Sequence, residues 1–184
     1  DHDGDNFSEL PALDNNSFGL NSFFNLDKNQ KLEANFSSTY EYRYGGEIVD
    51  KPAFLAQQSE ERTHNIVMGG INYDFVSDDN QSSFSVYTAG QSTRRKHFTG
   101  IAPDEDPELT EYNNNPPYGS SKNYTVQFGV QGNHMVNDFI TGANNLTLGV
   151  EYQIDDVFDE IEAYNYLIDQ NSRNLGAFLQ SDWA

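Results

Sequence analysis

The sequence predicts an all-β chain folded as an antiparallel up-and-down transmembrane β-barrel wall. Three observations lead to this prediction. Apolar and polar residues alternate along seven segments, short and long connections alternate between them, and aromatic residues gather near both ends of the segments. Because lipid offers no hydrogen bonds, a sheet that crosses a bilayer must pair its backbone groups within a closed barrel.

Seven strands follow from this two-residue period. The clearest segment, KLEANFSSTYEYRY, alternates for more than ten residues, which is long for a strand of a soluble protein. Apolar side chains therefore take one face of each strand, and small or polar side chains take the other. In chain order the predicted strands are 17–26, 31–44, 67–75, 82–90, 123–133, 145–154 and 174–184. Within the last of them, Phe178 breaks the alternation.

The connections sort by length. Short turns are predicted near 27–30, 78–81 and 137–145, and long loops near 1–15, 45–62, 95–121 and 155–172. Because the two kinds alternate, all long loops should lie at one edge of the sheet. In an outer-membrane barrel that edge is extracellular and the short turns are periplasmic.

Aromatic residues are expected to form two girdles at the borders of the bilayer. The alternative is that aromatic residues merely favour strands. The outer girdle comprises Tyr40, Tyr42, Tyr44, Tyr124 and Tyr152, and the periplasmic one comprises Phe24, Tyr73, Phe75, Phe84 and Trp183.

Composition excludes several function classes. The 184 residues carry a formal net charge of −19, which argues against a nucleic-acid partner, because phosphate binding needs concentrated Lys and Arg. The chain has no Cys, so a thiolate metal site and disulfides are excluded. Acid pairs such as Asp155 and Asp156 have no nucleophile or oxyanion donor beside them, so we predict no enzyme activity.

The order of three segments resembles consecutive barrel strands of a TonB-dependent outer-membrane receptor of the type abundant in Bacteroidota. These segments are NNSFGLNSFFNLDKNQKLEANFSSTYEYRYGGE, SEERTHNIVMGGINYDF and LGAFLQSDWA, and the sharpest parts are YEYRYGGE and GAFLQSDW. The resemblance runs through nearly all of residues 1–184. It implies about seven strands, roughly a third of the wall of a roughly 22-stranded barrel, with the plug domain absent from this segment.

The same resemblance implies a function and partners. Such receptors lie in the outer membrane of Gram-negative bacteria, among lipid and lipopolysaccharide, and their extracellular loops bind a scarce nutrient such as an iron chelate, cobalamin or a glycan. TonB energises import through the plug region, and a surface lipoprotein is a further expected partner. No cofactor is required.

The opening DHDGDNFSE suggests a calcium loop. Its alternating acids match the first three ligand positions of an EF-hand loop, but Asn6 and Ala12 stand where that loop needs Gly and Glu. Calcium would need further ligands, and the alternative is a solvated acidic loop. The candidate calcium ligands are Asp1, Asp3, Asp5 and Glu9.

Two other groups are candidate binding residues. Arg94, Arg95 and Lys96, at the outer end of a strand, would meet lipopolysaccharide phosphates or an anionic substrate, or else balance neighbouring acids. Residues on the presumed lumen face would bind a passing ligand or the plug. They are Glu41, Arg43, Gln127, Gln131 and Glu151.

Two rival functions remain. The first is a passive porin or adhesin-like outer-membrane barrel, whose long loops bind surfaces. The second is a soluble secreted β-sandwich that binds glycans through calcium. A lipid-facing stripe such as Tyr124, Val126, Phe128 and Val130 should require detergent, so solubility without detergent would favour the sandwich.

Overall fold

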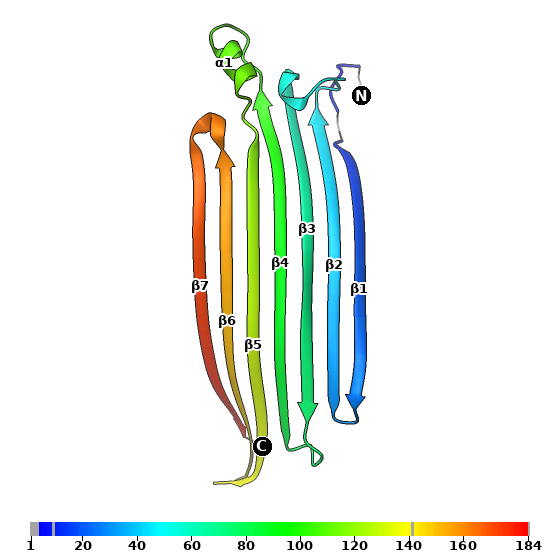
Figure 1. Cartoon of the computed structure of the whole chain (residues 1–184), viewed down its shortest axis with the longest axis vertical. Helices are drawn as coiled ribbons and strands as arrows, with labels where there is room; N and C mark the ends of the chain where they lie inside the picture. Colours follow the sequence, from blue (N-terminus) through cyan, green and yellow to red (C-terminus); the bar gives the residue numbers. More distant parts are fainter. Residues whose placement is uncertain (1–3, 9, 141, 184) are drawn as a thin grey trace.

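The computed structural model describes residues 4–8, 10–140 and 142–183, and these form one seven-stranded antiparallel sheet (Figure 1). The strands lie side by side in chain order, so the sheet is an up-and-down meander. Their bounds are β1 Ala12–Asp27, β2 Gln30–Gly46, β3 Gln58–Val76, β4 Ser82–Ile101, β5 Gly119–Phe139, β6 Gly142–Ile161 and β7 Tyr166–Trp183. The predicted all-β meander of seven strands is therefore confirmed.

The connections at the two ends of the sheet differ (Figure 1). At one end, β1–β2, β3–β4 and β5–β6 join through short turns. At the other, residues 47–57 contain the 3₁₀ helix η1 Ala53–Leu55, and residues 102–118 contain the helix α1 Glu108–Asn114. We call these the short-turn end and the long-loop end.

The strands are longer than predicted, at 16 to 21 residues. The largest difference lies at 155–172, which the sequence predicted as a long loop. Instead β6 continues to Ile161 and β7 begins at Tyr166, and they are joined by a short turn that contains the 3₁₀ helix η2 Glu162–Tyr164. The acids of this region suggested a loop. However, apolar residues such as Ile154 and Phe158 keep the two-residue period among them, and every position of β6 from 144 to 161 has a partner on β7.

Register between neighbouring strands is regular. No register shift interrupts the pairing of β2 with β3, β3 with β4 or β4 with β5. Residues directly opposite each other share a face of the sheet. Leu32, Tyr73 and Val86 therefore form one cross-strand row. Each strand contributes its apolar set to the same face, and its polar set to the other.

Little of the described chain is buried. The buried apolar residues are Ala53, Ala56 and Phe98, all at the long-loop end. There the rings of Phe54 and Phe98 pack against Tyr118, with centroids 6.2 and 5.1 Å apart. A β-sandwich needs two sheets packed face to face, whereas the described residues form a single sheet and do not by themselves make the sandwich of the second rival function.

Candidate functional site

The apolar face of the sheet carries a continuous band of hydrophobic side chains, which we call the apolar band. It covers five successive cross-strand rows, from the row of Phe75 and Phe84 to the row of Val67 and Tyr124. The second and third rows from the short-turn end contain no Asp, Glu, Lys or Arg among the described strands. Charges lie only in the outer rows, as Asp27 at the turn end of the first row, and as Arg173 and Asp156 in the two upper rows. The band's largest side chains are Phe18, Leu20, Phe24, Leu32, Phe36, Ile71, Tyr73, Phe75, Phe84, Tyr124, Phe128, Leu148, Tyr152, Ile154, Leu175 and Leu179.

No described segment covers this band. Leu175 and Leu179 are each 74% exposed, and Phe18 is 62% exposed. Apolar patches beyond a few hundred Å² are rare on soluble monomers, and they mark surfaces that contact a membrane or another protein. The apolar band is therefore the candidate functional surface of the chain.

Most of the predicted aromatic girdle residues lie near the borders of this band. Tyr40, Tyr42 and Tyr44 lie beyond it at the long-loop end, and Tyr124 lies in its top row. Tyr152 was predicted at the outer border but lies in the middle row, opposite Phe128. The reason is that β6 extends seven residues further than its predicted end, to Ile161, which leaves Tyr152 well inside the strand.

The opposite, polar face carries all five residues predicted to line a lumen. Glu41 and Arg43 lie together on β2, with the Arg43 Nε 3.4 Å from the Glu41 Oε1. Gln127, Gln131 and Glu151 lie on β5 and β6, so β3 and β4 separate them from the first pair. The structure therefore places these residues on one face but in two clusters.

Tyr87 belongs to this face, although the sequence analysis did not select it. Its hydroxyl donates a hydrogen bond of 2.5 Å to Glu151 Oε2. Its ring lies over Gly129, its direct partner on β5, where a Cβ would collide with the ring. The ring of Phe178 covers Gly149 in the same way. Phe178, which seemed to break the alternation, therefore lies on the polar face as its position requires, and the two rings compensate for glycines inside strands.

The basic run on β4 is divided between the two faces. Arg95 lies on the polar face, where its Nη2 donates to Ser121 Oγ at 2.9 Å and lies 4.0 Å from Asp159 Oδ1. Arg94 and Lys96 lie on the apolar face, beyond the apolar band, and are exposed. Because consecutive strand residues point to opposite faces, the three cations cannot act on one ligand.

The calcium prediction falls largely outside the described residues, because Asp1, Asp3 and Glu9 are not among them. Asp5 is described, and its Oδ1 accepts a hydrogen bond of 2.8 Å from the backbone N–H of Phe7. Among residues 4–8, 10–140 and 142–183, no group of three or more His, Asp or Glu side chains could hold a metal ion. Calcium binding at the start of the chain stays a prediction.

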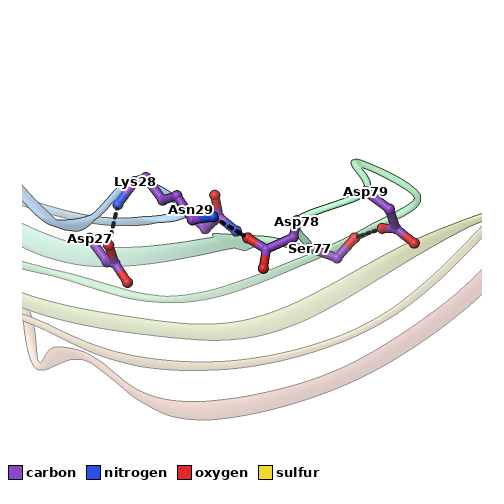
Figure 2. A network of polar contacts seen from close by, with 6 residues as sticks. All are labelled: Asp27, Lys28, Asn29, Ser77, Asp78 and Asp79. Atoms are coloured by element: carbon purple, nitrogen blue, oxygen red, sulfur yellow. Dashed lines mark hydrogen bonds and ion pairs between the residues drawn. The ribbon is translucent and has the colours of Figure 1, made fainter.

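At the short-turn end, two neighbouring turns are joined by a polar network (Figure 2). Lys28 Nζ lies 2.8 Å from Asp78 Oδ1, and the Asn29 side-chain amide donates to the same oxygen. Hydrogen bonds from Lys28 and then Asn29 hold the pKa of Asp78 below its ordinary value. Asp79 stabilises its own turn by accepting from Ser77 Oγ and from the Gln81 backbone N–H. The network fixes the β1–β2 turn against the β3–β4 turn.

Comparisons with known proteins assign no family, because no protein-family model matches the chain and no curated protein matches its sequence. Within the described residues, no helix has the length and apolar character needed to cross a membrane.

Proposed function

We propose that this chain is part of the barrel wall of a TonB-dependent outer-membrane receptor, which binds a scarce nutrient at its extracellular loops and imports it into the periplasm. The observation that carries the proposal is the two-sided meander: seven consecutive strands with an uncovered apolar band on one face and polar side chains on the other. That alternation is the pattern of outer-membrane barrel strands.

The height of the apolar band supports a membrane location. Its five rows span eight residue steps along each strand, or roughly 27 Å at about 3.4 Å per residue. At a strand tilt of about 40° this becomes roughly 21 Å, close to the apolar band of about 25 Å on outer-membrane barrels. At the long-loop end, two of the three connections are loops of 11 and 17 residues, 47–57 and 102–118, as in such barrels, and only the connection between β6 and β7 is short.

The polar face supports a lumen. Glu151, Glu41 and Arg43 would be costly in contact with lipid, but on the opposite face they would line a water-filled or plugged interior. Their side chains already have protein partners, so they would present ordered oxygens and N–H groups to a ligand or to a plug domain. The assignment to the TonB-dependent receptors, rather than to another class of barrel, is based on the sequence resemblance.

Two experiments on the complete protein test the proposal. After cell fractionation, we expect the protein in the outer membrane, resistant to a urea wash and released only by detergent. Recovery in the soluble fraction would contradict the proposal. Next, a strain that lacks the protein should lose growth on a limiting iron chelate, cobalamin or glycan.

A passive porin and a TonB-dependent receptor differ in whether uptake needs an energy source. Uptake through a TonB-dependent receptor should stop when a protonophore abolishes the proton-motive force, with the protein still present in the outer membrane. Uptake that continues under those conditions would favour the passive barrel.

A further inference from the structure

The strand pair β3–β4 anchors both long loops at its end. Phe98 of β4 is buried there and packs against Tyr118 of the second long loop, and Tyr118 packs in turn against Phe54 of the first. The Tyr118 hydroxyl also donates a hydrogen bond of 3.3 Å to Oε2 of Glu61, which lies directly opposite Phe98 on β3. Beyond His97, β4 has no partner on β5 among the described residues. The Glu61–Phe98 pair therefore fixes the loops, and only the β3–β4 ladder holds it.

His97 belongs to the next pair of the same ladder, directly opposite Arg62. Its side chain lies on the polar face, beyond the apolar band, and its ring covers Gly119, where a Cβ would collide with it. Its Nδ1 is buried and has no hydrogen-bond partner within the described chain. A neutral imidazole can leave this nitrogen without a proton, whereas an imidazolium carries N–H groups on both nitrogens. Protonation of His97 would therefore bury an N–H group without an acceptor, which destabilises the folded state.

The charges around His97 also favour its neutral form. The charged and titratable groups near it on the polar face come from β3, β4 and β6, and they are Glu60, Arg62, His64, Arg95 and Asp159. Both acids already pair with arginines, at 2.6 and 4.0 Å, and β5 places only the uncharged Gly119 and Ser121 beside the ring. A protonated His97 would thus lie opposite Arg62 without an acid of its own, and like charges directly opposite destabilise a sheet. Burial, and then the charge of Arg95, hold the pKa of His97 below its ordinary value of 6.5.

We propose that His97 is a pH-sensitive switch, which loosens both long loops when it takes up a proton. The neutral ring keeps the Arg62–His97 pair closed. The proton weakens this pair through repulsion from Arg62 and through the buried N–H group without an acceptor. The adjacent Glu61–Phe98 pair then opens with it, because no strand holds it on the β5 side. The inference rests on the proposed function only for what the loops do: if they bind the nutrient, acid lowers its affinity.

The test is hydrogen exchange of the complete protein in mild detergent, followed by mass spectrometry from about pH 8 to about pH 5. Each exchange rate is divided by the intrinsic amide rate at the same pH, which leaves the opening equilibrium. The variants His97→Phe and His97→Gln remove the titrating group, and His97→Phe keeps a ring over Gly119. His134→Gln is the matched control, because His134 lies at the short-turn end, with its Nδ1 2.8 Å from Ser82 Oγ.

Neutral His97 stabilises this end fully above its ordinary pKa of 6.5, and the stabilisation is lost as the pH falls from 6.5 through the lower folded value. We therefore expect the protection of residues 58–62, residues 97–101 and both long loops to fall over this range. The fall should be about tenfold for each pH unit that separates the two pKa values. Amides at the short-turn end should keep their protection. His134→Gln should respond as the wild type does, and both His97 variants should lose the response.

Protection at the long-loop end that does not change with pH would overturn the inference. A folded His97→Gln or His97→Phe protein that keeps the wild-type response would also overturn it, because another group would then be titrating. These results are separable from failure of the proposed function. Recovery of the protein in the soluble fraction would refute the membrane location and leave the exchange result unchanged. A pH response in a protein that imports no nutrient would refute only the receptor.

Discussion

Val150→Arg is the substitution that best tests whether the apolar band faces lipid. Val150 lies opposite Val130 on β5 and Ala177 on β7, and it is 45% exposed. It is the central member of an apolar series on β6. That series is Leu146, Leu148, Val150, Tyr152 and Ile154.

The expected magnitude depends on what surrounds this face. In water, a polar substitution at so exposed a position would change the free energy of unfolding by no more than about 0.5 kcal/mol. At the midplane of a bilayer, Arg on the lipid face of a barrel costs about 2–4 kcal/mol. This is roughly 30-fold to 1,000-fold in the folding equilibrium. We therefore expect Val150→Arg to fall in the larger range.

The assay is urea unfolding of the complete protein in lipid vesicles, followed by tryptophan fluorescence. Gln153→Arg is the matched control, because Gln153 lies on the polar face of the same strand and bonds to Asp155, which would pair with the new cation. It should cost less than about 1 kcal/mol. Equal effects of the two substitutions, or a cost below about 0.5 kcal/mol for Val150→Arg, would refute the lipid-facing assignment.

A depth series separates lipid from a covering protein layer. In lipid, the cost of Arg should fall to about 0–1 kcal/mol towards the interface. Arg at Leu148, in the first row of the band, should therefore cost less than Arg at Val150, and Arg at Tyr152, in the middle row, should cost most. A covering protein would instead make the cost follow how deeply each side chain packs in the interface, with no dependence on depth.

Two further predictions concern the polar face and the turns. Gly129→Ala should destabilise the protein by about 1–3 kcal/mol, because the new methyl group would overlap the Tyr87 ring. In the control variant Gly176→Ala, the new methyl group meets no atom within 4 Å, so the stability should be nearly unchanged. Urea unfolding measures both variants. The pKa of Asp78 is lowered chiefly by its hydrogen bond with Lys28, so its contribution to stability is complete above the ordinary pKa of 3.8 and is lost as pH falls through the lower folded value. Asp78→Asn should abolish that part of the stability loss between about pH 5 and 2, and an unchanged acid profile would contradict the role of the network.

The sequence predicts the strands and their faces well, because a period of two depends only on local alternation. Leu32, Phe36 and Tyr40 were placed on one face from the pattern alone, and the register puts them there. The prediction fails where acids interrupt the apolar set. On β6, Asp155 and Asp156 point to opposite faces, so the two charges are accommodated in a strand that continues to Ile161.

Side-chain contacts between strands cannot be predicted from local alternation. Tyr87 reaches Glu151 across the intervening strand β5, and the two residues are 64 positions apart in the chain. No local pattern gives the register that brings them together. The two glycine–aromatic pairs of the polar face share this property, since Gly129 and Gly149 look like strand-weakening residues until the partner ring on the next strand is known.

The two outer strands of the sheet constrain how it can enter a bilayer. Within the described residues, β1 and β7 each pair on one side only. About nine residues of each lie within the rows of the apolar band, and roughly half of these turn both backbone groups outward. That leaves on the order of 18 unpaired N–H and C=O groups, each costing several kcal/mol in lipid, or on the order of 50 kcal/mol in all. A protein's whole stability is about 5–15 kcal/mol, so the sheet can face lipid only where further strands pair with both β1 and β7. The apolar band and the unpaired edges therefore lead to the same conclusion, since lipid can cover the face only if other strands close the sheet.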